Sequence, residues 1–265
     1  MTAAALASGG TFDQVGLLAG RAVRRVIRQP AQIVFPIAFP LVLLAVNASG
    51  LDAATKLPGF PSADYLDFAL AVPFMQGALF AALNGGQDLA RDIQGGFLDR
   101  LALTPISGAA LLAGQLGGAL FMGVVSAVLY LLVGLALGVG IAAGVAGALV
   151  LLVLAVCISF AFACFGMLVA LRAGTGEAVQ GFFPLFFVLL FLSSAFFPRD
   201  LIEQDWFAAV ATYNPVSYMV EGLRSLVITG WDGEALAYAF AISAIAVVCF
   251  LVLSSRALRT RLTRT

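Results

Sequence analysis

Six long apolar stretches without a charged residue dominate the sequence. They lie at about residues 31–50, 68–87, 108–137, 144–171, 178–197 and 235–255. Each is long enough to cross a bilayer as an α-helix, which takes about 20 residues. The backbone there must be helical because unpaired N–H and C=O groups are too costly in hydrocarbon. The pattern therefore predicts an all-α integral membrane protein with six transmembrane helices.

The composition indicates one membrane domain without a second, soluble domain. Apolar residues make up 62% of the chain and charged residues only 11%, whereas a soluble domain has roughly 45–50% and 25%. We divide the chain into an N-terminal segment 1–30, a six-helix domain 31–255 and a basic tail 256–265.

The basic residues predict how the chain is oriented. If the N-terminus is cytoplasmic, 11 of the 14 lysine and arginine residues fall in cytoplasmic segments, as the positive-inside rule requires. The three on the other side are Lys56, Arg199 and Arg224. Since an even number of spans places both termini on one side, both are predicted to be cytoplasmic.

Residues 12–28 have the pattern of an amphipathic helix ahead of the first span. At 100° per residue most apolar side chains share one side, and the other side carries Arg21, Arg24, Arg25 and Arg28. Such a helix can bury its apolar side at the membrane surface and present its arginines to anionic lipid. Alternatively, the arginines serve only as a topology signal.

The residue types exclude several kinds of chemistry. The chain has no histidine, and its only lysine, Lys56, follows Thr55, so a nucleotide-binding loop of the form GxxxxGK[ST] is impossible. No ionisable residue lies near the middle of a predicted span, which argues against a proton- or ion-coupled carrier. Energy for transport would therefore come from outside the chain.

The segment 88–107, on the predicted cytoplasmic side, mixes charged and apolar residues. Gly95 and Gly96 allow a sharp bend, and a short helix at about 97–103 is predicted to end before Pro105. A bent surface helix with aromatic and charged side chains suits the docking of a soluble partner. The alternative is a plain polar connector between two spans.

The segment 198–234, on the predicted outer side, is rich in aromatic and acidic residues, and its apolar set is too short to span. Because Trp and Tyr concentrate at membrane interfaces, we expect one or two short helices in, or re-entering, the outer leaflet, bent at Asn214 and Pro215. Glu221 and Arg224 lie three residues apart on one helical face and could pair with each other.

Short motifs in these segments resemble those of a known family. They are Asp92, Gly96-Phe97-Leu98-Asp99-Arg100-Leu101, Thr104-Pro105-Ile106-Ser107, Pro184, Phe191 to Pro198, Asn214-Pro215-Val216-Ser217-Tyr218, Glu221-Gly222 and Arg224. In order and spacing the sequence resembles the permease subunits of ABC type-2 exporters, particularly those of the daunorubicin/doxorubicin-resistance type. The likeness extends from the first span to the sixth.

The resemblance implies a fold, partners and a location. It implies six helices per subunit, an amphipathic N-terminal helix, a cytoplasmic coupling helix and short re-entrant outer helices. Two permease subunits, identical or different, would pair above two separate ATPase subunits, which hold the ATP and magnesium. This chain would bind no cofactor, would not itself be an enzyme, and would lie among the lipids of a bacterial plasma (inner) membrane without a nucleic-acid partner.

Residue by residue, the resemblance assigns two sets, and the aromatic residues suggest a third. The residues assigned to ATPase coupling are Asp88, Arg91, Asp92, Gly96, Phe97, Asp99, Arg100, Leu101, Thr104 and Pro105. The residues assigned to the outer gate, in the re-entrant outer segment, are Asn214, Pro215, Tyr218, Glu221 and Arg224. For the substrate path we select Phe35, Phe39, Phe74, Phe183 and Phe187. Aromatic surfaces can hold a flat apolar cargo by burial and stacking, although packing against lipid is the alternative for each ring.

The preferred function is that of an exporter permease that moves a lipophilic or amphipathic compound, such as a drug, a natural product or a lipid. Export of a lipid-linked glycan or polysaccharide is an alternative within the family. From another class, the alternative is a membrane-embedded lipid-modifying enzyme, which would need a cluster of polar catalytic side chains near an interface.

Overall fold

A computed structural model of the chain describes residues 11–97 and 108–262. Every regular element within these ranges is a helix, which confirms the all-α prediction. The elements are α2 (Thr11–Ile27), α3 (Ala31–Leu51), η1 (Asp52–Lys56), α4 (Tyr65–Ala69), α5 (Ala71–Gln94), α7 (Gly108–Ala136), α8 (Gly144–Ala173), α9 (Gly176–Gly181), α10 (Phe183–Phe191), η2 (Arg199–Leu201), α11 (Asp205–Tyr213), α12 (Pro215–Ile228) and α13 (Gly233–Leu262).

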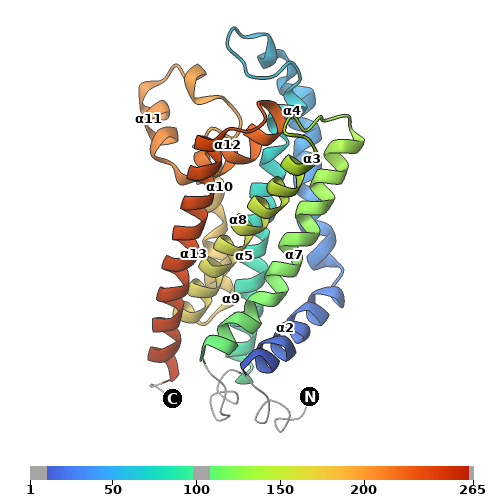
Figure 1. The fold of residues 1–265 in the computed structure, drawn as a ribbon. Coiled ribbons are helices and arrows are strands. Elements are labelled where there is room, and N and C mark those ends of the chain that lie inside the picture. The colour runs from blue at the N-terminus through green and yellow to red at the C-terminus, as the bar shows by residue number, and fades with distance from the viewer. Residues whose placement is uncertain (1–10, 98–107, 263–265) are drawn as a thin grey trace.

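Helices long and apolar enough to cross a membrane form the body of the protein. In the described part of the chain there are five: Ala31–Lys56, Tyr65–Gln94, Ala110–Ala136, Gly144–Ala173 and Gly233–Arg261. A shorter apolar segment, Gly176–Phe191, takes the place of another expected span. Figure 1 shows the long helices as one upright bundle, with α2 lying obliquely across its lower end. The end of α13 lies at this same lower end, as an even number of crossings requires.

The fifth predicted span, 178–197, differs from the structure. Its helix is interrupted at Phe182, between α9 and α10, and it ends at Phe191. Pro184 accounts for the interruption because it lacks the amide hydrogen that would continue the hydrogen-bond ladder of α9. After Phe191 the chain turns, and the hydroxyl of Ser193 donates to the carbonyl oxygen of Leu190 at 2.6 Å. Local bonds of this kind compete with helix continuation.

The second predicted span, 68–87, is longer in the structure. The helix α5 continues to Gln94, so Asp88 and Asp92 lie on its last two turns rather than in a loop. α5 crosses α8 at very short range: a Cβ built on Gly166 of α8 would lie 2.0 Å from the carbonyl oxygen of Ala82. Only glycine fits at this crossing.

Two prolines inside α3 each remove a backbone donor. In an α-helix the amide of one residue bonds to the carbonyl four residues earlier, so Pro36 frees the carbonyl of Gln32, and Pro40 frees that of Pro36. Asn84 of α5 donates to the first at 3.5 Å. Tyr130 of α7 donates to the second at 2.6 Å. Neighbouring helices thus satisfy both carbonyls.

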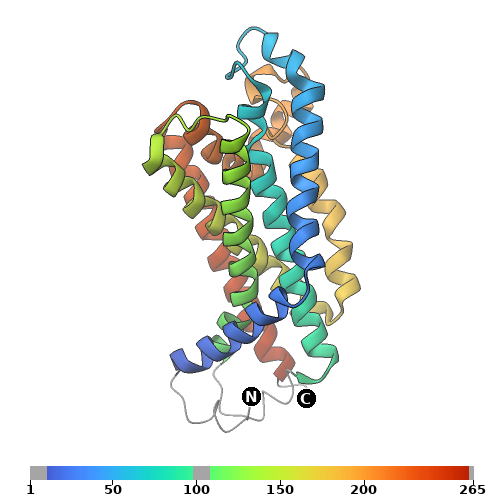
Figure 2. The ribbon, with the colours of Figure 1, turned by 90° about the vertical axis from the view of Figure 1, so that its right-hand side faces the viewer.

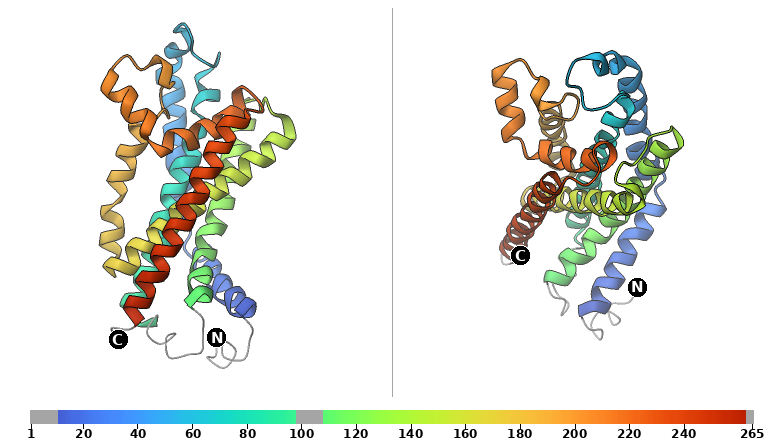
Figure 3. Two further views of the ribbon diagram at one scale, coloured as in Figure 1. Left: turned by 60° about the vertical axis from the view of Figure 1, so that its left-hand side comes forward. Right: turned by 45° about the horizontal axis from the view of Figure 1, so that its top comes forward.

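The two short outer helices expected from the sequence are present, as α11 and α12, at the end opposite α2 (Figure 3). They are separated at Asn214, whose side-chain oxygen accepts from the amide of Val216 at 3.0 Å. The side-chain amide of Asn214 donates to the carbonyl of Leu189 in α10 at 2.6 Å. Pro215 is the first residue of α12, where a missing amide hydrogen costs nothing.

Candidate functional site

The helix α2 packs against α7. A Cβ built on Gly114 of α7 would lie 2.3 Å from the Cβ of Leu18, and one built on Gly118 would lie 3.2 Å from that of Ala22. Small residues on α7 therefore let the two helices touch. The amphipathic helix expected from the sequence is present, but this part of its apolar side packs on protein rather than on lipid.

This placement turns two arginines of α2 toward the end of α5. Arg21 donates to both carboxylate oxygens of Asp92, each at 3.0 Å, and Arg25 donates to one of them at 2.6 Å. Gln115 of α7 donates to the same carboxylate at 2.9 Å. The Asp92 side chain is 4% exposed, so a buried charge is satisfied by three donors. The expectation that these two arginines present their charge to lipid is wrong.

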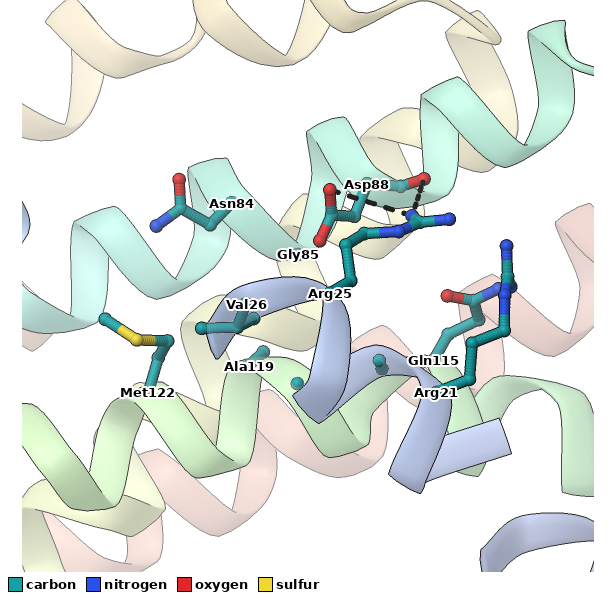
Figure 4. Close-up of a pocket in the computed structure, with 11 residues that line it drawn as sticks. Arg21, Arg25, Val26, Asn84, Gly85, Asp88, Gln115, Ala119 and Met122 are labelled. Carbon is teal, nitrogen blue, oxygen red and sulfur yellow. Dashed lines mark hydrogen bonds and ion pairs between the residues drawn. The ribbon is translucent and has the colours of Figure 1, made fainter. Parts of the chain in front are cut away.

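Arg25 also reaches Asp88, one turn before Asp92 (Figure 4). Its guanidinium lies 3.3 Å from the Asp88 carbonyl oxygen and 3.7 Å from its carboxylate. Burial works against the charge of Arg25, but the bond to Asp92 and the two carboxylates outweigh it and hold its pKa above the ordinary value. The recess beside these residues has room for about one water molecule, about 10 Å³. It is a contact between helices rather than a ligand pocket.

Phe97 follows the end of α5 and lies against Arg21. The guanidinium carbon is 3.8 Å from the centre of the ring, a cation–π distance. Gly96 permits the turn between them because its φ of +63° is a conformation that glycine adopts at little steric cost. Arg21 therefore contacts both the last turns of α5 and the residue from which segment 98–107 continues. We call the following set the α2–α5 junction: Arg21, Arg25, Asp88, Asp92, Phe97 and Gln115.

The predicted coupling residues fall into three groups. Asp88 and Asp92 are held by α2, whereas Arg91 is 51% exposed and Gly96 and Phe97 are partly exposed. Outside the described residues lie Asp99, Arg100, Leu101, Thr104 and Pro105. Sequence reasoning missed the partners of Asp92, which are Arg21, Arg25 and Gln115. The available signal was the shared i, i+4 spacing of the two arginines and the two aspartates.

Figure 2 shows α3, α5 and α10 side by side. Four of the predicted substrate-path phenylalanines lie on α3 and α10 and contact one another there. The ring centre of Phe39 lies 5.6 Å from that of Phe35 and 6.4 Å from that of Phe187. Phe183 lies 4.8 Å from Phe187. Phe80 of α5 completes the group, 5.6 Å from both Phe35 and Phe183. We call these five rings the aromatic seam.

Phe74, the fifth predicted residue, is not part of the seam. Its ring packs edge-on against Tyr130 of α7, with 5.7 Å between the ring centres. Because Phe74 and Phe80 are six positions apart on a helix of 3.6 residues per turn, they leave α5 on different sides.

Arg224 is buried and does not pair with Glu221, which corrects the expected i, i+3 pair. It donates to the carbonyl oxygens of Phe68, Ser194 and Ala195, at 3.0, 2.9 and 2.8 Å. Two of these carbonyls belong to the turn after α10, which has no helical ladder to satisfy them. A guanidinium, with five donors, can satisfy several such carbonyls at once.

Glu221 pairs instead with Arg199, from the segment before α11. The guanidinium of Arg199 also lies over the ring of Tyr218, 4.6 Å from its centre. These contacts join α12 to the chain that follows α10. The predicted outer residues are therefore near one another, but through partners other than those expected.

A model of the ABC-2 type transporter family matches residues 13–228. The chain belongs to the ABC-2 type transporter family. The matched range runs from α2 to the end of α12, so it includes the α2–α5 junction, the aromatic seam and the outer helices. Over 206 residues the chain is 30% identical to the daunorubicin resistance ABC transporter permease protein DrrB1 of Streptomyces coeruleorubidus. This alignment covers 74% of the chain and 69% of the relative.

Membership of the ABC-2 family confirms the resemblance found in the sequence. The protein is a multi-pass membrane protein and a transport subunit, and its family works in general with an ATPase partner and as a dimer. The apolar helices of the described residues fit this assignment.

Proposed function

We propose that this ABC-2 protein is the permease subunit of an exporter that moves a lipophilic or amphipathic compound outward with ATP hydrolysed by separate ATPase subunits. Two permease subunits, identical or different, pair in the membrane above two ATPase subunits, which bind the ATP and magnesium. The α2 end of the bundle faces the cytoplasm of a bacterial cell, and the ATPase docks there.

The α2–α5 junction is the observation that carries this proposal. It lies where α5 ends and the segment 98–107 begins, and it leaves Arg91 and Phe97 accessible beside a buried, fully bonded carboxylate. Exposed arginine and aromatic side chains are the residues that most often anchor protein interfaces. The segment 98–107, which contains other predicted coupling residues, therefore continues from an end of α5 that is fixed to α2.

A transport subunit without a nucleotide site of its own needs a rigid mechanical connection to its ATPase subunits. A displacement of segment 98–107 would reach α5 through the continuous chain and α2 through Arg21, which holds both Asp92 and Phe97. Phe80 lies on the same helix as Asp92, twelve residues earlier, which is about 18 Å along the axis. The helix α5 can thus link the docking end to the aromatic seam.

The aromatic seam supports the proposal that the transported compound is apolar. Rings at centre distances of 4.8–6.4 Å line the meeting place of α3, α5 and α10, and aromatic surfaces hold flat apolar molecules by burial and stacking. The relative's name, a daunorubicin resistance permease, favours a drug-like compound over a glycan.

The test is reconstitution of the permease with its ATPase in lipid nanodiscs or vesicles, followed by measurement of cargo-stimulated ATP hydrolysis and of export. We expect Phe97→Ala and Arg100→Glu to uncouple hydrolysis from export without preventing membrane insertion. Phe12→Ala is the control, because Phe12 lies on α2 with 94% of its side chain exposed. Normal stimulation and export in both Phe97→Ala and Arg100→Glu would refute the coupling role, and a permease that associates with no ATPase would refute the function.

A further inference from the structure

The amide side chain of Gln76, in the second turn of α5, is buried without a hydrogen-bond partner among the described residues. The residue is 1% exposed, and within the described part of the chain neither its side-chain oxygen nor its nitrogen has a partner. Two other polar side chains of the bundle differ: Asn84 of α5 and Tyr130 of α7 both bond to carbonyls of α3. Buried polar groups are nearly always paired, so this one needs an explanation.

The unpaired side-chain amide of Gln76 lowers the stability of the folded protein, and no hydrogen bond of this side chain among the described residues offsets that loss. Burying such a group without hydrogen bonds destabilises the folded protein, and an apolar group of the same shape would avoid that cost. Gln76 therefore does not stabilise the bundle by any bond that the structure contains. A molecule that brings its own hydrogen-bonding group could recover the lost energy.

The helical position of Gln76 places it at the aromatic seam. Phe80 is one turn further along α5, at i+4, so the two residues share a face. That ring meets Phe35 of α3 and Phe183 of α10. Leu83, at i+7 from Gln76, lines a recess shared with Phe183 and α8. On this face of α5, Phe80, one turn after Gln76, thus contacts α3 and α10, and Leu83, two turns after Gln76, lies beside α8 and α10.

We propose that Gln76 recognises a neutral hydrogen-bonding group, such as a ketone or hydroxyl, on a flat apolar molecule held in the aromatic seam. A primary amide offers both a donor and an acceptor, and the rings around it favour a neutral group over a charged one, whose burial would cost far more. This proposal rests on the function proposed above and adds a residue that determines which cargo is selected.

The seam must open to admit a molecule of this kind. The recess beside it has room for about one water molecule, about 10 Å³. On one side the seam is bounded by α3, most of whose residues are not buried, and on the other by α10, which is separated from α9 by the break at Phe182. Phe39 and Phe187 meet edge to face across it. Separation of these two rings would expose Gln76 to a ligand between α3 and α10.

The test uses two probes that differ by one carbonyl group, fluorenone and fluorene. Their binding to the purified full-length permease in lipid nanodiscs is measured for the wild type, Gln76→Leu and Gln76→Asn. We expect Gln76→Leu to weaken fluorenone binding about tenfold, as loss of one good hydrogen bond does, and to leave fluorene binding unchanged. Gln76→Asn, which keeps the amide on a shorter side chain, is expected to recover part of the preference. Met75→Leu, one residue away on another side of α5, is the matched control.

Thermal unfolding of the same variants distinguishes recognition from a structural role. Gln76→Leu should unfold at or above the wild-type temperature, because it removes an unpaired buried amide. A clear fall in unfolding temperature, an equal loss of both probes, or a wild type that does not prefer fluorenone would each overturn the proposal. The exporter function is tested separately. If Gln76→Leu keeps ATPase stimulation, export and the wild-type preference for fluorenone, the role of Gln76 is refuted, but the exporter function is not.

Discussion

Tyr130 donates its hydroxyl hydrogen to the carbonyl oxygen of Pro36, over 2.6 Å, across the contact between α7 and α3. That carbonyl is free because Pro40, four residues later, has no amide hydrogen to give it. The tyrosine ring is fully buried, so water cannot replace the bond. A proline-containing helix on the outside of the bundle is thus fixed to the interior at the point where its own ladder is broken.

We predict that Tyr130→Phe will lower the free energy of unfolding by about 1–3 kcal/mol, because the change leaves a buried carbonyl without a donor. The measurement is denaturant or thermal unfolding of the purified protein in one detergent. Tyr213→Phe is the control: Tyr213 is 88% exposed on α11, and the same change there should have little effect. Equal stability of the two variants would show that the Pro36 carbonyl does not depend on Tyr130.

The crossing of α5 and α8 gives a second prediction. A Cβ at Gly166 would lie 2.0 Å from the carbonyl oxygen of Ala82, which is backbone and cannot easily move. Gly166→Ala should therefore force the two helices apart and destabilise the protein by about 1–3 kcal/mol or more. Gly181→Ala provides the contrast, since nothing lies within 4 Å of the Cβ built there. Unfolding curves of the two alanine variants should separate clearly, and coincident curves would contradict the close approach.

The sequence was sufficient for the parts of the fold that depend on local composition. Long uncharged stretches predict spanning helices because hydrocarbon allows no other backbone, and α3, α5, α7, α8 and α13 all occur where such stretches lie. The interruption after Gly181 depends on competition between Pro184 and a strongly apolar run. Apolar content alone could not show which would prevail.

The partners of the charged residues could not be predicted in the same way. Glu221 and Arg224 have the spacing of a helical pair, yet Arg224 bonds to carbonyls more than 25 residues away in the chain. The turn after α10 needs donors, and that need becomes visible only when α10 and α12 are placed together. Asp92 shows the same limitation, because its partners on α2 lie about 70 residues earlier.

A third prediction distinguishes the observed outer ion pair from the expected one. In a double-mutant cycle, Arg199→Gln and Glu221→Gln should couple by about 0.5–1 kcal/mol, as partly exposed pairs do. Arg224→Met should destabilise the protein by about 3 kcal/mol or more, because it leaves three buried carbonyls without donors. Most of that loss should remain when Glu221 is already glutamine. A loss that disappears in the Glu221→Gln background would restore the pair expected from the sequence.

The fourth prediction concerns the buried carboxylate that ties α2 to α5. Asp92→Asn removes the negative charge that Arg21 and Arg25 share, and breaking one partner of a buried ion pair costs about 3 kcal/mol. The two arginines then repel each other at the same site, so α2 should separate from α5 and α7 more often. Hydrogen exchange followed by mass spectrometry should show faster exchange in residues 11–27, with less change in the α8 core.

Arg24→Gln is the matched control for this experiment, because Arg24 is exposed on α2. Among the residues that the structure describes it bonds only within its own helix, to the carbonyl of Gly20. That variant should leave the exchange of α2 nearly unchanged. If segment 98–107 docks the ATPase as proposed, Asp92→Asn should also reduce export more than it reduces ATP hydrolysis, because the ion pairs that fix α5 to α2 beside this segment would be lost. Protection of α2 that is equal in the two variants would mean that the glycine contacts with α7 hold this helix without the ion pair.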